Sequence, residues 1–138
     1  MTTDTRAMAA DQTPITVSAM LAEARRQVAD VPPEELAGLR DAEPDLVLLD
    51  VREPEEYALG HLPGSVHIPR GKLEFLADPA SSYADPRLNP DRPVAVYCQK
   101  GPRAILAAAT LQRLGYRQVV NVAGGYEAWM ARAGTPAR

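Results

Sequence analysis

Cysteine and histidine are scarce in this sequence, which has one cysteine, Cys98, and two histidines among 138 residues. A single cysteine excludes an internal disulfide. One cysteine and two histidines also fall short of the four ligands of a usual zinc site. We therefore expect no metal, no cofactor and a reducing compartment, most simply the cytoplasm.

Long apolar runs and a dominant charge are absent as well. No apolar run approaches the roughly 20 residues that span a membrane. The N-terminal segment MTTDTRAMAADQT has no apolar core of a secretory signal. Lys and Arg number 15 against 18 Asp and Glu, for a net charge of −3, and no basic stripe suggests nucleic-acid binding. These absences exclude nucleic acid and membrane as expected partners.

The chain is expected to have three parts. Residues 1–14 are polar and form a flexible N-terminus. Residues 15–30 carry apolar side chains at helical spacing and form an amphipathic helix that packs on its own domain. Residues 31–138 form that domain, which is long enough for a proper core.

Apolar runs that alternate with helix-forming segments predict the fold. Continuous apolar runs suit strands covered on both faces. They occur at residues 46–51, 66–69, 94–97 and 118–122. Between and after them, helical turns are expected at residues 33–39, 54–57, 71–76, 104–114 and 126–133. This alternation predicts an α/β fold with a parallel sheet covered by helices on both faces.

Cys98 lies where a predicted buried strand meets a predicted helix. The loop between them, CQKGPR, contains Lys100 and Arg103, and Pro102 suits the first helical turn. Open N–H groups and the helix dipole favour negative charge at such a place. The loop is therefore predicted to hold an anion, either the Cys98 thiolate or a group attached to it. A buried structural cysteine is the alternative.

Three ordered motifs resemble those of a single rhodanese domain, a sulfurtransferase family, from about Val31 to Trp129. They read LLDVREPEEYALGHLPGSVHIPRGKLEF, VYCQKGPR and LGYRQVVNVAGGYEAW. They are similar to the family's first signature with Asp-Val-Arg and Gly-His-Ile/Leu-Pro-Gly, its Cys-x-x-Gly-x-Arg active loop and its closing Gly-Gly-x-x-x-Trp signature. The resemblance implies a rhodanese-like, five-stranded parallel sheet with helices on both faces.

The resemblance also implies roles for the loop. Cys98 would be the catalytic nucleophile and would carry a sulfane sulfur as a persulfide. Gln99, Lys100, Gly101 and Arg103 would bind the substrate as an anion cradle. The implied reaction moves sulfur from thiosulfate or a similar small donor to a thiol or cyanide. Because the chain has no second cysteine, the acceptor must come from outside.

Other positions either depart from the family pattern or support it. A Ser or Thr often follows the loop arginine, but here Ala104 does, and Pro102 has no N–H to offer the cradle. Asp50 and Arg52 match family residues near the cleft. We expect Asp50 to organise the loop through Arg103, and Arg52 to form a salt bridge of the fold.

Both histidines and the single tryptophan are expected to be structural. His61 could act as a base for Cys98, but its place in a Gly-His-Leu-Pro-Gly turn favours a structural role. His67 is interpreted in the same way, and Trp129 is predicted to lie in the core.

Two alternative functions remain open. The cell-cycle dual-specificity phosphatases share the implied fold, which makes a phosphatase or arsenate reductase a candidate. Their loop is Cys-x5-Arg, whereas this one is Cys-x4-Arg, and a smaller ring of amides suits a single sulfur better than a phosphate. The other alternative is a non-catalytic rhodanese-like module that binds a partner, which the missing hydroxyl at Ala104 leaves open.

Overall fold

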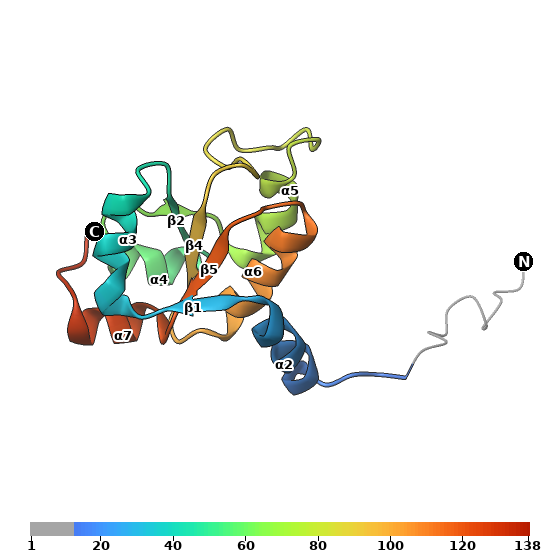
Figure 1. Ribbon diagram of the computed structural model, residues 1–138, viewed down its shortest axis with the longest axis horizontal. Coiled ribbons are helices and arrows are strands. Elements are labelled where there is room, and N and C mark those ends of the chain that lie inside the picture. Colours follow the sequence, from blue (N-terminus) through green and yellow to red (C-terminus); the bar gives the residue numbers. More distant parts are fainter. Residues whose placement is uncertain (1–12) are drawn as a thin grey trace, which may run out of the picture.

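Five parallel strands form one sheet in the computed structural model, which describes residues 13–138. Most of the predicted flexible N-terminus therefore lies outside the described residues. The strands are β1 (Ala29–Val31), β2 (Val47–Asp50), β3 (Val66–His67), β4 (Val94–Tyr97) and β5 (Val119–Val122). Their order is β1-β5-β4-β2-β3, and every neighbouring pair is parallel (Figure 1). The predicted five-stranded parallel sheet is confirmed.

Helices cover both faces of this sheet (Figure 1). On one face lie α2 (Val17–Gln27), α5 (Leu73–Ala77) and α6 (Pro102–Arg113). On the other lie α3 (Leu36–Ala42) and α7 (Gly125–Arg132). The remaining helical segments are α4 (Pro54–Leu59) and the 3-10 turns η1 (Pro33–Glu35) and η2 (Arg70–Lys72).

The central strand β4 shows why a continuous apolar run predicts such a sheet. All four of its residues are buried. Val94 and Val96 pack into the cluster beneath α6, whereas Ala95 and Tyr97 pack into the cluster beneath α3 and α7. Successive side chains of a strand point to opposite faces, so only an apolar run can satisfy both layers. Cys98 follows in register on the α6 side.

The sequence patterns do not predict β1. The helix expected over residues 15–30 is α2, which begins after Thr16, whose hydroxyl oxygen accepts the N–H of Ala19 at 3.0 Å. It packs against α6 and buries Ala24. The chain then forms the edge strand β1, which pairs with β5. Because only Val31 of this three-residue strand is buried, no apolar run marks it.

The chain order of the strands places the functional site. From β2 the chain continues to β3 on one side, and from β4 it continues to β5 on the other, although β2 and β4 are neighbours. Open α/β sheets bind ligands beyond the carboxyl ends of the strands at such a reversal. The residues that follow β2 and β4 are therefore the first to inspect.

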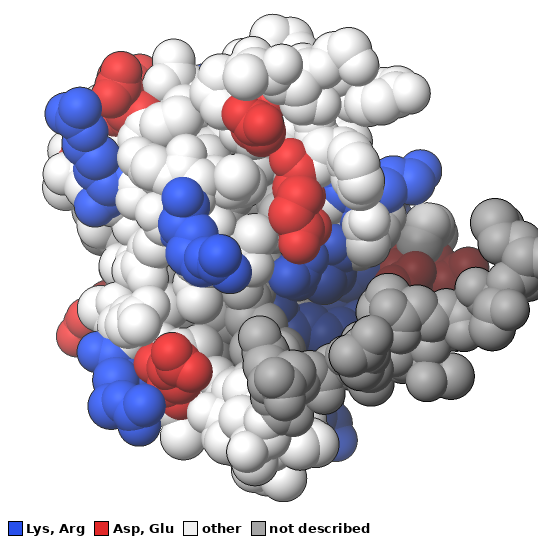
Figure 2. Space-filling view, turned by 90° about the vertical axis from the view of Figure 1, so that its right-hand side faces the viewer, with Lys and Arg blue, Asp and Glu red and all other residues white. Residues whose placement is uncertain are grey.

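The described region has no membrane-spanning helix, and the face drawn in Figure 2 has no basic stripe. No helix among residues 13–138 is both long and apolar enough to cross a bilayer. On the face shown in Figure 2, acidic and basic side chains form small separate groups of either sign.

Candidate active site

The catalytic-loop candidate runs from the end of β4 into the N-terminus of α6. Gly101 has a φ of 137°, a conformation that glycine adopts without strain, and this lets the loop turn directly into Pro102. The Cys98 Sγ accepts the backbone N–H of Gly101 at 3.1 Å and that of Ala104 at 3.4 Å. The sulfur therefore lies where the open amides of α6 point, as the sequence predicts.

A pocket of about 290 Å³ opens over this loop. It is lined by Cys98, Gln99, Lys100, Pro102 and Arg103. Cys98 itself is 0% exposed, so the predicted nucleophile lies beneath the pocket surface. Gly101 is also buried and contributes its N–H from below. The structure thus brings the five predicted loop residues to one place.

The N-terminus of α7 holds the backbone of the loop from the other side. The N–H of Tyr126 donates to the Cys98 carbonyl at 2.8 Å, and that of Glu127 donates to the Gln99 carbonyl at 3.1 Å. Gly125, at a φ of 63°, lies so close that a Cβ there would overlap the Cys98 carbonyl oxygen. Only glycine allows this approach, which explains why the Gly-Gly motif lies at this point.

A buried ion pair, Asp50–Arg52, lies at the end of β2 and forms what we call the floor pair. The side chains are 0% and 1% exposed, and Arg52 Nη2 is 2.8 Å from Asp50 Oδ2. The Arg52 backbone N–H also donates to Asp50 Oδ1 at 2.8 Å. Burial alone lowers the pKa of Arg52, but the hydrogen bonds and charge of Asp50 outweigh it and raise that pKa. The guanidinium therefore stays charged, and its predicted salt bridge is present.

Arg52 connects the floor pair to the candidate catalytic loop. Its Nη1 donates to Gln99 Oε1 at 3.0 Å, and its Nη2 donates to the Gly60 carbonyl at 2.7 Å. Its guanidinium carbon lies 4.3 Å from the centroid of the Tyr126 ring, a cation–π distance. The Gln99 side chain is consequently held from beneath rather than left free in the pocket.

A second, partly exposed pair, Glu56–Arg103, lies at the mouth of the pocket; we call it the rim pair. Arg103 Nη1 is 2.6 Å from Glu56 Oε1, and Nη2 is 3.0 Å from Oε2. The hydrogen bonds from Arg103 hold the pKa of Glu56 at about 2, although partial burial opposes this shift.

These two pairs correct one prediction. Asp50 does not organise the loop through Arg103, because it pairs with Arg52, and Arg103 pairs with Glu56. Sequence reasoning did not select Glu56. The available signal was an acid in the first turn of a helix that starts just after β2, at the same sheet edge as Cys98.

The two histidines take part in packing. The Tyr57 ring stacks on His61 at 3.7 Å and on His67 at 4.3 Å between ring centroids. His61 Nδ1 is 3.1 Å from the Tyr57 carbonyl, and His67 Nε2 is 2.8 Å from the Arg52 carbonyl. These contacts agree with the structural roles expected from the sequence, and Trp129 lies in the core as predicted.

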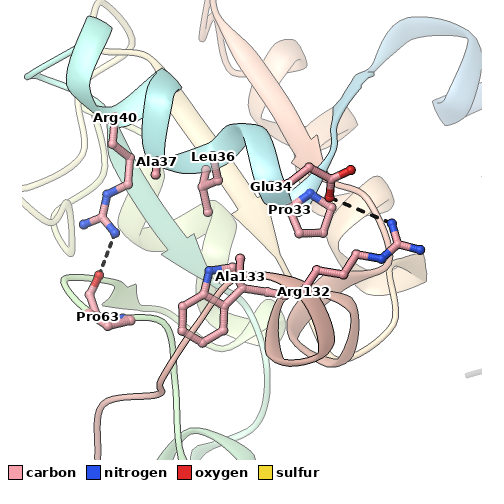
Figure 3. Close-up of a pocket in the computed structure, with 9 residues that line it drawn as sticks. Pro33, Glu34, Leu36, Ala37, Arg40, Pro63, Arg132 and Ala133 are labelled. Atoms are coloured by element: carbon pink, nitrogen blue, oxygen red, sulfur yellow. Dashed lines mark hydrogen bonds and ion pairs between the residues drawn. The ribbon is translucent and has the colours of Figure 1, made fainter.

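Elsewhere in the described region, a second hollow of about 310 Å³ lies between η1, α3 and α7 (Figure 3). Its charged side chains are engaged within the protein: Arg40 donates to the Pro63 carbonyl at 2.8 Å, and Arg132 lies 3.9 Å from Glu34. None of the predicted site residues lines it. Among residues 13–138, no group of three or more His, Cys, Asp or Glu is arranged to hold a metal ion.

Comparison with known sequences gives a family match over most of the chain. The family model of the rhodanese-like domain matches residues 32–132. The chain is 36% identical to a sulfurtransferase of Allochromatium vinosum, covering 71% of this chain and 82% of that protein. It is 34% identical to the thiosulfate sulfurtransferase GlpE of Pseudomonas savastanoi, covering 73% and 86%. It spans only 45% and 64% of the Bacillus subtilis relatives YrkF and YqhL.

Solved structures show the same architecture. A Rhodopseudomonas palustris protein described as a possible tyrosine phosphatase matches with a TM-score of 0.83 and 35% identity, over 94% of this chain and 100% of that one. The human single-domain sulfurtransferase TSTD1 matches with a TM-score of 0.68 and 28% identity, over 78% and 99%.

Proposed function

The chain belongs to the rhodanese-like domain family, and we propose that it is a sulfurtransferase of the thiosulfate sulfurtransferase type. In this proposal a persulfide on Cys98 carries a sulfane sulfur from thiosulfate or a similar donor to an external thiol or cyanide. The observation that carries it is the Cys98 sulfur, held by two backbone N–H groups at a helix N-terminus beneath a pocket with a cationic rim. The sulfurtransferase relatives support the same chemistry.

The first half-reaction forms the persulfide. The Cys98 thiolate attacks the outer sulfur of thiosulfate, a new sulfur–sulfur bond forms, and the bond to the central sulfur breaks. Sulfite leaves with that electron pair, so RS⁻ and S₂O₃²⁻ become RSS⁻ and SO₃²⁻, and total charge is conserved. The N–H groups of Gly101 and Ala104 stabilise negative charge on the attacking sulfur without having to reorient.

The second half-reaction returns the enzyme to its starting state. A thiolate or cyanide attacks the outer sulfur of the persulfide, and the Cys98 thiolate leaves as RSS⁻ and CN⁻ become RS⁻ and SCN⁻. Because Cys98 is the only cysteine, no second thiol of the chain competes for the sulfur. The only cysteine must also remain reduced between turnovers, which is why we place the reaction in the cytoplasm.

Phosphoryl transfer is a second candidate because of the similarity to the Rhodopseudomonas palustris protein. The loop argues against it. Four residues separate Cys98 from Arg103, and one of them, Pro102, has no N–H to offer a phosphate oxygen. Arg103 is engaged bidentately by Glu56 rather than free to bind three equatorial oxygens. We expect an aryl phosphate to be turned over far more slowly than thiosulfate; comparable rates would favour the phosphatase.

Intact-mass spectrometry after incubation with thiosulfate tests the proposal directly. We expect the chain to gain one sulfur atom, to lose it on addition of cyanide, and to gain none when Cys98 is alkylated beforehand. A chain that gains no sulfur from thiosulfate or from any other sulfane donor would instead fit a non-catalytic module that binds a partner.

A further inference from the structure

The charges at the mouth of the pocket do not simply add up to a strong anion site. We call Lys100 together with the rim pair, Arg103 and Glu56, the rim. Both terminal nitrogens of Arg103 are engaged by the two oxygens of Glu56, at 2.6 and 3.0 Å. Lys100 is exposed and forms no ion pair within the described residues. Pairing thus leaves the rim with the net charge of one cation.

Glu56 is fixed in this position from two sides. It lies in the first turn of α4, and its Oε1 accepts the backbone N–H of Glu53 at 3.0 Å as well as the guanidinium of Arg103. A carboxylate held by its own helix does not move aside easily when an anion enters the pocket. Its pKa of about 2, set mainly by the Arg103 hydrogen bonds, also keeps it ionised at neutral pH.

Arg103 lies within electrostatic range of the reacting sulfur. It lies in the first turn of α6 and lines the same pocket as Cys98. The pKa of Arg103 is raised mainly by its hydrogen bonds to Glu56, against the effect of burial, with smaller electrostatic contributions from Glu56 and from Cys98. Whatever cancels the charge of Arg103 therefore changes the potential that an incoming donor meets above Cys98.

We propose that Glu56 tunes the charge selectivity of the site: by neutralising Arg103 it weakens the preference for the thiosulfate dianion and so lets monoanionic sulfane donors, such as thiosulfonates or alkyl persulfides, compete for Cys98. This inference rests on the proposed sulfur transfer. Its physical basis is that a unit of negative charge beside the pocket repels a dianion about twice as strongly as a monoanion at the same place. Glu56 is in this sense a residue that acts on the donor through Arg103.

Thiosulfate and methanethiosulfonate make a matched pair of donors. Both present an outer sulfur to Cys98, and methanethiosulfonate reacts as RS⁻ + CH₃SO₂S⁻ → RSS⁻ + CH₃SO₂⁻, with one charge fewer on the donor. The measurement is kcat/KM for each donor in wild type and Glu56→Gln. Gln keeps an oxygen for the Glu53 N–H but removes the charge. We expect the thiosulfate-to-methanethiosulfonate ratio to rise about three- to tenfold in Glu56→Gln, and less at high salt.

Glu55→Gln is the matched control. Glu55 precedes Glu56 on α4, is exposed, and forms no ion pair among the described residues. The same charge is removed from the same helix without freeing Arg103, so we expect the donor ratio to change by less than about twofold. A purely structural role of Glu56 would lower kcat/KM for both donors equally and leave the ratio unchanged.

Protection of Cys98 from iodoacetamide tests charge selection without any sulfur transfer. Sulfate and methanesulfonate are unreactive anions of two charges and one, and we expect sulfate to gain protection relative to methanesulfonate in Glu56→Gln. An unchanged ratio for both the donors and the protecting anions overturns this inference and leaves the proposed function intact. If neither donor loads sulfur yet the protection ratio shifts, charge selection stands and the proposed function fails.

Discussion

Two arginine–carboxylate pairs bracket the loop that carries Cys98, and the main difference between them is their exposure to solvent. The floor pair, Asp50–Arg52, is 0% and 1% exposed, whereas the rim pair, Glu56–Arg103, is 30% and 38% exposed. The floor pair reaches the loop through the Gln99 side chain. The rim pair instead joins the loop to α4 at the mouth of the pocket. Burial therefore makes one pair a support for the shape of the loop and leaves the other as a control on its charge.

Breaking the floor pair should cost much more folding stability than breaking the rim pair. Removing one partner of a buried pair leaves an uncompensated charge in a medium that solvates it poorly, which costs about 3–5 kcal/mol. A solvent-screened pair contributes only about 0–1 kcal/mol to stability, because water replaces much of what the partner provides. Substitutions at the floor should thus unfold the protein more readily, and those at the rim should mainly change which ligand enters.

The largest effect should come from removing the Cys98 sulfur, which lies in the loop between the two pairs. We expect Cys98→Ser to lower thiosulfate:cyanide sulfurtransferase activity below about a tenth of wild type, because a serine hydroxyl cannot carry a transferable sulfane sulfur. Thiocyanate formation measures the activity, and circular dichroism checks that the fold is unchanged. Residual activity above that level in the variant would contradict the persulfide assignment.

Arg52→Ala tests whether the floor pair contributes more to stability than the rim pair does. It leaves the Asp50 carboxylate buried without its partner, so we expect the free energy of unfolding to fall by about 3–5 kcal/mol. Arg103→Ala, as the matched change at the rim, should cost less than about 1 kcal/mol. Urea unfolding of the two variants beside wild type gives both values. Equal losses would show that burial does not separate the two pairs as argued here.

Gln99→Ala cuts the link between the floor pair and the loop while leaving the pair itself in place. A hydrogen bond to a charged group contributes about 1.5–3 kcal/mol, so its loss from the loop should slow persulfide formation by about tenfold or more. Stability should also fall, by about 1–3 kcal/mol, because the change removes the acceptor of Arg52 Nη1 in a buried side chain, so the rates are compared where the variant is fully folded. Gln112→Ala is the control, since Gln112 donates to the Gln27 carbonyl, far along α6 from the loop. Equal slowing by both changes would remove the special role of Gln99.

Most of the fold can be predicted from the sequence because its central strands must satisfy two buried faces. The runs at β2, β4 and β5 are mostly apolar for that reason, with Asp50 and Asn121 as buried exceptions. The prolines and glycines beside these runs mark where α4 and α6 begin and end. The edge strand β1 escapes prediction because it has only one covered residue and therefore needs no apolar pattern. Its pairing with β5 depends on contacts from the far end of the chain.

The candidate site also has parts that can be predicted from the sequence and parts that cannot. The position of Cys98 at a strand–helix junction follows from local sequence, since Pro102 and the loop glycine are local signals. Which carboxylate meets which arginine does not follow from local sequence. Asp50, Glu56 and the two arginines all lie at one sheet edge, so several pairings satisfy the charges equally well in sequence, and only the tertiary structure shows which pairs form. The pairing of Glu56 with Arg103 could therefore be found only from the three-dimensional structure.

The smallest expected effect is the stability that the rim pair contributes as the pH changes. The pKa of Glu56 in the folded protein is about 2, below its ordinary value of 4.5, so the pair stabilises the fold when the carboxylate is ionised. That contribution is fully present above the unfolded pKa and is lost as the pH falls from about 5 towards 2. Wild type should therefore be slightly more stable than Glu56→Gln at neutral pH, by no more than about 1 kcal/mol given the exposure of the pair, and the difference should shrink on acidification.

Denaturant unfolding at several pH values measures this difference in stability. Repeating the comparison in an Arg103→Ala background isolates the pair, because the difference should then be small at every pH. A gap that widens as the pH falls would mean that Glu56 stabilises the protein in its protonated form, and the rim could not then act as the charge control described here.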